Sequence, residues 1–303
     1  MRNVKRFLSL ALALIMVIAF ACACGGNKTE APAGAPAGSG DALPAAAAGV
    51  NDGTGPVLRV AMECGYAPYN WTQSDDSNGA VPIKDSSDFA YGYDVMMAKY
   101  IAEQLGMDLE IVKLDWDSLP MAVQAGTVDC VIAGQSITSE RLETVDFSTP
   151  YYYASIVTLT KKDSPFAKAT CIEELKGAKA TSQLNTVWYD VCIPQIPEVN
   201  VQTAQESAPQ MLTALDAGAV DIVVTDQPTA MGAVAVYPDM VMLDFTESNG
   251  NFQVSDEEIN IGISMQKGNS GLLNAINGVL AGLTTDDFTD WMNQAIKVQP
   301  MND

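Results

Sequence analysis

The chain has 303 residues and a formal net charge of -21, with 16 Lys and Arg against 37 Asp and Glu. Its length favours two lobes over one domain, and the acidic balance excludes a nucleic-acid partner, because phosphate binding needs clustered Lys and Arg. The sequence contains no histidine, which excludes Ser-His-Asp and Cys-His catalysis and His-ligated metal sites. CxxC spacing is also missing. We therefore expect neither a metal nor any other cofactor.

The N-terminus is typical of an export signal. Three basic residues precede an apolar run at 7–21, which is too short for a comfortable membrane span. The cysteines that follow resemble those of a bacterial lipoprotein signal, with Cys24 as the lipidated residue and Cys22 as the alternative. A simple cleaved signal is the other interpretation. We predict a lipoprotein signal over 1–24, a disordered Ala/Pro/Gly-rich tether over 25–56, and an extracytoplasmic protein anchored to the cell membrane.

From residue 57 the apolar pattern alternates between strands and helices. The predicted elements are a strand at 57–62, a helix at 95–105 between an Asp94 N-cap and Gly106, a strand at 108–114, a helix at 118–125 and a strand at 128–133. This order predicts a mostly parallel sheet flanked by helices. The polar segment 73–90 is predicted to be an extended loop or hairpin at the rim.

An internal echo connects two distant parts of the chain. Residues 122–134 read AVQAGTVDCVIAG, and residues 214–226 read ALDAGAVDIVVTD. Both copies indicate a helix end, a glycine cap and an apolar strand, which predicts two lobes of one architecture. In this alignment Asp226 takes the place of Gly134, so Arg141 and Asp226 are expected to flank one cleft.

The later chain continues the same alternation. Strands are predicted at 179–181, 240–244 and 259–265, and closing helices at 271–283 and 286–298. Thr186 is a good N-cap for a helix that runs to about Asp190. Cys171 and Cys192 fall in this region and are able to pair in an oxidising compartment, although a sequence does not determine connectivity.

Polar residues after the predicted strands suggest an anion site. Gly134 allows a ligand to approach the backbone closely. Arg141, with the hydroxyls of Ser136 and Thr186, suits a carboxylate, because guanidinium–carboxylate pairs are bidentate and charge-assisted. A solvated arginine in a plain strand-to-helix turn is the alternative.

Carboxylates and aromatic rings complete the candidate site. Asp226 follows an apolar strand and calls for a cationic partner, unless it caps the turn after it. Glu63 ends the first strand and suits a polar or positive ligand group, or is a surface carboxylate. Tyr66 and Trp116 offer flat faces to a ligand, whereas Tyr69 and Trp71 are expected in the core. An arginine for a carboxylate and an aspartate for an ammonium together describe an α-amino acid site.

Four motifs carry a family resemblance: LRVAMECGYAPYNW (58–71), YGYDVMMAKYIAEQLG (91–106), WDSLPMAVQAGTVDCVIAGQSITSERLETVDFSTPYYY (116–153) and VDIVVTDQP (220–228). The chain resembles the bacterial family 3 extracellular solute-binding proteins, the polar amino acid receptors of ABC importers. The resemblance implies a type II, two-lobed Venus flytrap. Lobe 1 would hold 57–153 plus 257–303, lobe 2 would hold 154–256, and the hinge would lie at 152–155 and 256–260.

The resemblance also implies a role for each site residue. Arg141, Ser136 and Thr186 would bind the ligand α-carboxylate. The Gly134 carbonyl and Asp226 would hold the ammonium, Tyr66 and Trp116 would stack on the side chain, and Glu63 and Gln183 would select it. The chain has Asn185-Thr186 where the family usually has Gly-Thr. Asn tolerates a left-handed backbone, so the turn is expected to survive.

The predicted function is a monomeric, non-enzymatic receptor that takes up a free amino acid and delivers it to an ABC permease and ATPase complex. Glu63 favours arginine, lysine or protonated histidine, and Gln183 suits the amide of glutamine. One alternative is an exported dehydratase on the same fold, with Glu63 or Asp226 as the acid. The other is an amino acid sensor or surface adhesion module that transports nothing.

Overall fold

The computed structural model describes residues 56–300. The predicted signal, its Cys24 and nearly all of the predicted tether lie outside the described residues. Within 56–300, no helix is both long enough and apolar enough to cross a membrane.

The first lobe is built on a five-stranded sheet with the order β6-β1-β7-β16-β8. Its strands are β1 (Val57–Met62), β6 (Asp108–Lys113), β7 (Cys130–Val131), β8 (Val145–Phe147) and β16 (Ser264–Gln266). β1 pairs in parallel with β6 and β7, whereas β16 runs antiparallel to β7 and β8.

The second lobe repeats this arrangement in the order β12-β11-β13-β10-β14. Its strands are β10 (Ile156–Lys161), β11 (Lys179–Thr181), β12 (Asn200–Val201), β13 (Ile222–Asp226) and β14 (Met240–Leu243). β11 is parallel to β12 and β13, and β10 is antiparallel to β13 and β14. The two-lobed α/β class with mostly parallel sheets is confirmed, because four of the five strands in each sheet run in one direction and only β16 or β10 runs against them.

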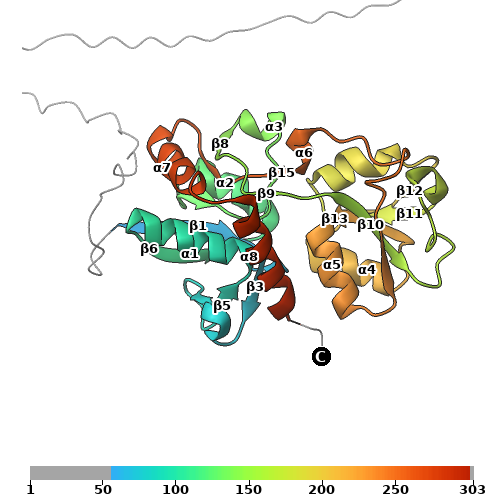
Figure 1. The fold of residues 1–303 in the computed structure, drawn as a ribbon, viewed down its shortest axis with the longest axis horizontal. Coiled ribbons are helices and arrows are strands. Elements are labelled where there is room, and N and C mark those ends of the chain that lie inside the picture. Colours follow the sequence, from blue (N-terminus) through green and yellow to red (C-terminus); the bar gives the residue numbers. More distant parts are fainter. Residues whose placement is uncertain (1–55, 301–303) are drawn as a thin grey trace, which may run out of the picture. The chain divides into compact units, whose positions relative to one another are not determined.

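The antiparallel strands follow from the crossings between the lobes. β9 (Tyr152–Tyr153) pairs antiparallel with β15 (Asn260–Ile261), and Figure 1 shows these two segments side by side. Directly after each crossing the chain enters a sheet, as β10 and as β16. The parallel strands end where the lobes meet, so a strand that starts from a crossing runs in the opposite direction.

The two copies of the echo have the same structural role. Asp129 accepts a hydrogen bond from the backbone N–H of Arg59 at 2.8 Å, and Asp221 accepts one from the backbone N–H of Lys179 at 2.9 Å. Each aspartate thereby ties the start of its strand to the neighbouring parallel strand. Gly134 and Asp226 consequently lie at equivalent positions, at the carboxyl ends of β7 and β13.

Helices cover the sheets and connect the strands. They are α1 (Tyr93–Leu105), α2 (Leu119–Gln124), α3 (Ser139–Leu142), α4 (Ala208–Asp216), α5 (Gln227–Val236), α6 (Asp256–Ile259), α7 (Ser270–Leu280) and α8 (Thr285–Val298). α1 buries the apolar face predicted from its spacing and ends at Gly106 in the left-handed conformation. It packs against α7 and α8 (Figure 1).

Three sequence predictions were wrong in detail. The N-cap of α1 is Gly92, whereas Asp94 lies inside the first turn with its carboxylate hydrogen-bonded to Tyr151 and Asn70. The apolar run at 259–265 forms two strands rather than one, because its first part pairs with β9 at the crossing. The turn after Thr186 is a π-helical segment, Trp188–Cys192.

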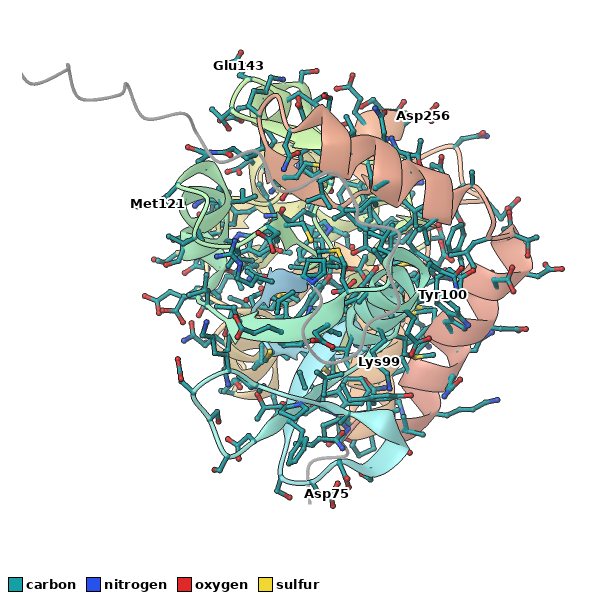
Figure 2. All side chains as sticks on the ribbon, turned by 90° about the vertical axis from the view of Figure 1, so that its left-hand side faces the viewer. Asp75, Lys99, Tyr100, Met121, Glu143 and Asp256 are labelled. Atoms are coloured by element: carbon teal, nitrogen blue, oxygen red, sulfur yellow. The ribbon has the colours of Figure 1, made fainter. Side chains whose placement is uncertain are left out.

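The polar segment 73–90 contributes to a small rim sheet. Its strands, in the order β2-β3-β5-β4, are β2 (Gly65–Tyr66), β3 (Asn70–Gln73), β4 (Val81–Pro82) and β5 (Phe89–Tyr91). Figure 2 shows Asp75 at the outer end of this sheet. The hairpin prediction for this segment is confirmed. The four cysteines within 56–300, including Cys171 and Cys192, are free thiols, so the possible disulfide is not formed.

Candidate functional site

Four predicted site residues follow the parallel strands. Glu63 follows β1, Gly134 comes shortly after β7, Gln183 lies two residues beyond β11, and Asp226 is the last residue of β13. Parallel strands present their carboxyl ends at one edge of a sheet, and ligands of open α/β sheets bind there. The two lobes bring these edges into contact.

A short loop of the second lobe makes much of this contact. The Gln183 side chain donates to Glu63 Oε1 at 3.2 Å. The Leu184 carbonyl accepts from the indole N–H of Trp116 at 3.1 Å. Trp116 opens a short 3₁₀ turn, Trp116–Ser118.

Asn185 extends this contact on both its side chain and its backbone. Its side-chain amide donates to Asp117 Oδ1 at 2.8 Å, and its carbonyl accepts from the Arg141 guanidinium at 2.9 Å. Its φ is 55°, the left-handed conformation expected for a residue that replaces glycine. Asp117 was not among the predicted site residues, because a single aspartate in a polar turn gives no signal of its partner.

Arg141 is held between the lobes by neutral groups. Its guanidinium also donates to the Ser136 carbonyl at 2.8 Å and lies 5.6 Å from the centre of the Trp116 ring. Burial lowers the pKa of Arg141 from its usual value. Among residues 56–300 no carboxylate lies within ion-pair distance of this guanidinium. A half-buried cation with free donors is suited to bind a carboxylate.

Asp226 is fully buried on the opposite lobe. One oxygen accepts from the backbone N–H of Thr229 at 2.8 Å and so caps α5, while the other accepts from the Tyr66 hydroxyl at 2.5 Å. Burial raises the pKa of this carboxyl. The cap and the contact with the other lobe therefore coexist, although the sequence analysis treated them as alternatives. Within the described chain no cationic side chain pairs with Asp226.

Tyr66 lies against the core and against Gly134. Its ring stacks on Tyr69 with centroids 4.7 Å apart, and a Cβ added to Gly134 would come within 2.8 Å of its edge. Gly134 has a φ of 64°, so close approach and backbone conformation both require glycine here. The Tyr66 hydroxyl reaches Asp226 from the same side.

Glu63 is 9% exposed. Oε1 accepts from Gln183, whereas the buried Oε2 has no partner within the described residues. Burial above all raises the pKa of Glu63 to about 7; the hydrogen bond from Gln183 opposes the rise, and the nearby carboxylates of Asp94, Asp115 and Asp117 contribute to it. Glu63 is therefore a buried acid rather than a surface carboxylate.

The predicted hydroxyl ligands point elsewhere. The Ser136 hydroxyl donates to the Glu258 carbonyl at 3.2 Å, and the Thr186 hydroxyl donates to the Gln183 carbonyl at 2.7 Å. The Thr186 oxygen also accepts from the backbone N–H of Tyr189. The structure thus places Ser136 and Thr186 beside Arg141 but engages their hydroxyls in backbone contacts.

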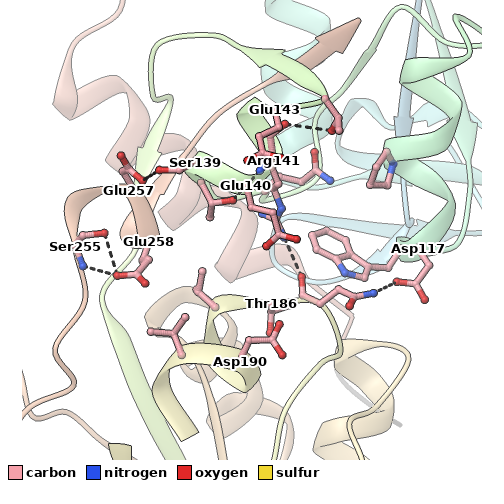
Figure 3. Close-up of a pocket in the computed structure, with 18 residues that line it drawn as sticks. Asp117, Ser139, Glu140, Arg141, Glu143, Thr186, Asp190, Ser255, Glu257 and Glu258 are labelled. Atoms are coloured by element: carbon pink, nitrogen blue, oxygen red, sulfur yellow. Dashed lines mark hydrogen bonds between the residues drawn. The ribbon is translucent and has the colours of Figure 1, made fainter. Parts of the chain in front are cut away.

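Two cavities open on either side of Trp116. The larger, of about 660 Å³, is lined by Arg141 and Thr186 and contains six acidic residues and one cation (Figure 3). In it burial raises the pKa of Asp190, with Glu140 adding to the rise and Arg141 opposing it. The smaller cavity, of about 450 Å³, is lined by Glu63. The other predicted site residues are not among the linings of these two cavities. Tyr66, Gln183 and Asp226 lie in contacts between the lobes, whereas Gly134 and Ser136 contact residues of the first lobe.

Paired lobes with matching sheets and charged groups at their facing strand ends define a two-lobed ligand-binding protein. The family model of the bacterial extracellular solute-binding proteins, family 3, matches residues 58–295. The chain belongs to this family, and its role is to bind a solute rather than to catalyse a reaction.

Named relatives lie at moderate distance. The L-cystine-binding protein TcyJ of Escherichia coli K12 is 27% identical over 233 residues, which is 76% of this chain and 78% of that protein. A substrate-binding protein of an amino acid ABC transporter from Streptococcus pneumoniae, solved with L-arginine, is 26% identical at a TM-score of 0.69 and covers 80% of this chain and 94% of its own. An ancestral arginine-binding protein bound to arginine is 30% identical at a TM-score of 0.62, and the match covers 78% of this chain and 97% of that chain.

Proposed function

We propose that this protein captures a polar L-α-amino acid between its lobes, with a cationic side chain preferred and an amide side chain second. The observation that carries the proposal is the pair of uncompensated charges on facing lobes. Half-buried Arg141 has no carboxylate partner, and buried Asp226 has no cationic partner, within residues 56–300. A zwitterion supplies both partners at once.

The α-carboxylate of the ligand would bind the Arg141 guanidinium, with Ser136 and Thr186 beside it. The α-ammonium would bind Asp226 and the Gly134 carbonyl, and would take over the Asp226 oxygen that now accepts from Tyr66. A charged group in direct contact is a stronger partner for a carboxylate than a phenol is. Tyr66 and Trp116 would lie against the side chain.

The charge balance favours a cationic side chain. Glu63 and Asp226 carry two negative charges when ionised, against one positive charge on Arg141. A ligand with net charge +1 compensates the excess, and Glu63 Oε2 offers a buried acceptor for it. Relatives solved with arginine support this order. Gln183, which is 2% exposed beside Glu63, suits an amide such as that of glutamine.

The assembly around this binding site is part of the same proposal. We place the lobe boundaries at 57–153 plus 257–303 and at 154–256, because the crossings pair as β9 and β15. These crossings would act as the hinge on which the lobes close. Cys24 would carry the lipid, and the monomer would deliver its amino acid to an ABC permease and ATPase complex. The ABC transporter relatives support delivery.

Calorimetry on the mature chain from Gly25 tests the proposal. The panel contains the twenty L-amino acids and L-cystine, after any co-purified ligand has been removed by partial unfolding and dialysis. We expect L-arginine or L-lysine to bind most tightly. Two arginine analogues serve as matched controls: agmatine lacks the α-carboxylate that Arg141 would bind, and 5-guanidinopentanoate lacks the α-ammonium that Asp226 would bind. Equal affinity for arginine and both analogues would contradict the proposed site, and tightest binding of L-cystine would contradict the preference for a cationic side chain.

A further inference from the structure

A buried carboxylate outside the proposed ligand contacts stands out in the first lobe. Asp94, in the first turn of α1, is 0% exposed. Among residues 56–300 it has no cationic partner within ion-pair distance. Burying a carboxylate without a counter-ion is costly. Stability of the fold alone does not account for this residue, because an apolar side chain would avoid that cost.

Asp94 is the centre of two short hydrogen-bond chains. One oxygen accepts from the Tyr151 hydroxyl at 2.7 Å, and that hydroxyl accepts from the backbone N–H of Gly134 at 3.2 Å. The other oxygen accepts from the Asn70 amide at 2.8 Å, and the Asn70 carbonyl oxygen accepts from the backbone N–H of Cys64 at 2.8 Å. Asp94 is thus two hydrogen bonds away from the backbone beside Glu63 and from the backbone at Gly134.

An acceptor at the centre fixes the direction of both chains. Tyr151 has one hydroxyl hydrogen, which goes to Asp94, so its lone pair is left for Gly134. Asn70 directs its NH₂ group to Asp94, so its carbonyl oxygen faces Cys64. Tyr151 and Asn70 donate to different oxygens of Asp94, so a neutral amide at position 94 would present an NH₂ donor to one of these two donors.

The two backbone positions held in this way both have the left-handed conformation. Cys64, directly after Glu63, has a φ of 51°, and Gly134 has a φ of 64°. A non-glycine residue in the left-handed region is uncommon and costs free energy. Such a turn persists when its surroundings hold it, and the Asn70–Cys64 hydrogen bond does so beside Glu63.

We propose that Asp94 is a positioning residue for amino acid recognition, which sets the turn of the side-chain selector Glu63 and the turn of Gly134 from one buried carboxylate. This inference rests on the proposed function. The hydrogen-bond chain through Tyr151 holds the backbone N–H of Gly134, the residue whose carbonyl would contact the ammonium of every amino acid ligand. The Asn70 chain acts on the residue that distinguishes side chains. Affinity and selectivity are therefore set together from one point in the core.

Three variants of the mature protein distinguish the hydrogen-bond chain through Tyr151 from the one through Asn70. Tyr151→Phe keeps the ring that stacks on Tyr93 and removes the link to Gly134. This variant is expected to lower the affinities for L-arginine and for L-glutamine by a similar factor, severalfold or more. Asn70→Ala removes the link to Cys64 and is expected to change the ratio of the two dissociation constants. Asp94→Asn is expected to do both, with at least a tenfold loss for L-arginine.

Asp129→Asn is the matched control, because Asp129 is a buried carboxylate at the opposite end of the same sheet and pairs with Arg59 at 2.6 Å. It is expected to lower the melting temperature without changing the arginine-to-glutamine ratio. If the wild type binds and all three variants keep its two dissociation constants, the inference is overturned and the proposed function stands. The inference is also overturned if Asp129→Asn moves the ratio as much as Asp94→Asn does. A wild type that binds neither amino acid overturns both.

Discussion

Glu63→Gln should remove both the preference for a cationic ligand and the pH dependence of its binding. Burial raises the pKa of Glu63 to about 7, so near neutral pH about half of the unliganded protein holds this group as the acid. A guanidinium or ammonium ligand needs the carboxylate. L-arginine should therefore bind more tightly as pH rises through 7, whereas L-glutamine should bind with little change.

The size of the effect follows from the fraction of Glu63 that is ionised. With a pKa of about 7, roughly a tenth of the groups are ionised at pH 6 and roughly nine tenths at pH 8. The affinity for L-arginine should thus rise about tenfold between these pH values. Binding at pH 6.5 should also release roughly three quarters of a proton. Truncation of one partner of a buried charge pair costs about 2–5 kcal/mol. Glu63→Gln should therefore lose that much binding free energy for L-arginine at pH 8.

Linkage predicts the opposite trend for the unliganded protein. The folded pKa of Glu63 lies above its ordinary value of 4.5, so its contribution to stability is present below pH 4.5 and is lost as pH rises through about 7. At about 1.4 kcal/mol for each pKa unit, the loss amounts to roughly 3 kcal/mol. Glu63→Gln should therefore flatten the decline in melting temperature between pH 5 and pH 8.

Calorimetry from pH 6 to pH 8.5, in buffers of different ionisation enthalpy, measures both the affinity and the protons released. Asp94 is a competing group, because burial raises its pKa to about 7 as well. If the arginine affinity of Glu63→Gln keeps the wild-type slope with pH, Glu63 is not the titrating group and the reasoning is refuted. A pH-independent wild type would refute it equally.

Three further changes test the remaining contacts. Arg141→Ala should cost about 2–5 kcal/mol of affinity for every amino acid ligand, and Lys84→Ala, at an exposed pair in the same lobe, should leave calorimetric affinity unchanged. Asp226→Asn should lose a similar amount of binding free energy, as measured by calorimetry. Its melting temperature should change little, because Asn also caps helices well. Asn185→Gly removes the bond to Asp117 and should speed ligand dissociation severalfold in stopped-flow experiments, since one hydrogen bond is worth about 0.5–1.5 kcal/mol; an unchanged rate would show that this bond does not hold the closed lobes.

The sequence predicted the architecture well because its signals are local and repeated. The β1 and β11 bounds match the apolar runs that predicted them, and the echo predicted two lobes of one design. Asp94 shows where such reasoning fails. An aspartate before an apolar helix looks like an N-cap, yet its partners Tyr151 and Asn70 are 57 and 24 residues away. No local pattern carries that information.

The sequence indicated charged residues at the strand ends and gave no indication of their neutral contacts. Arg141, Asp226 and Glu63 follow from the cost of burying charge at strand ends. The interlobe bonds of Trp116 and Asn185 use a backbone carbonyl and a side-chain amide, and neither leaves a compositional signal. The hydroxyl directions of Ser136 and Thr186 depend on which backbone carbonyl lies nearest after folding, so the sequence identified these residues but not their bonds.

The two copies of the echo are alike at the start of the strand, which serves the fold, and differ at its carboxyl end, which faces the other lobe. At the start of the strand the copies agree: Asp129 and Asp221 make the same backbone hydrogen bond to the neighbouring strand. At the carboxyl end they differ: Gly134 exposes backbone to the ring of Tyr66, while Asp226 brings a buried carboxylate to the hydroxyl of the same residue. Positions that build each sheet are kept alike because both lobes need them. The facing ends differ, and in the proposed site they would contact the same α-ammonium, Gly134 through its carbonyl and Asp226 through its carboxylate.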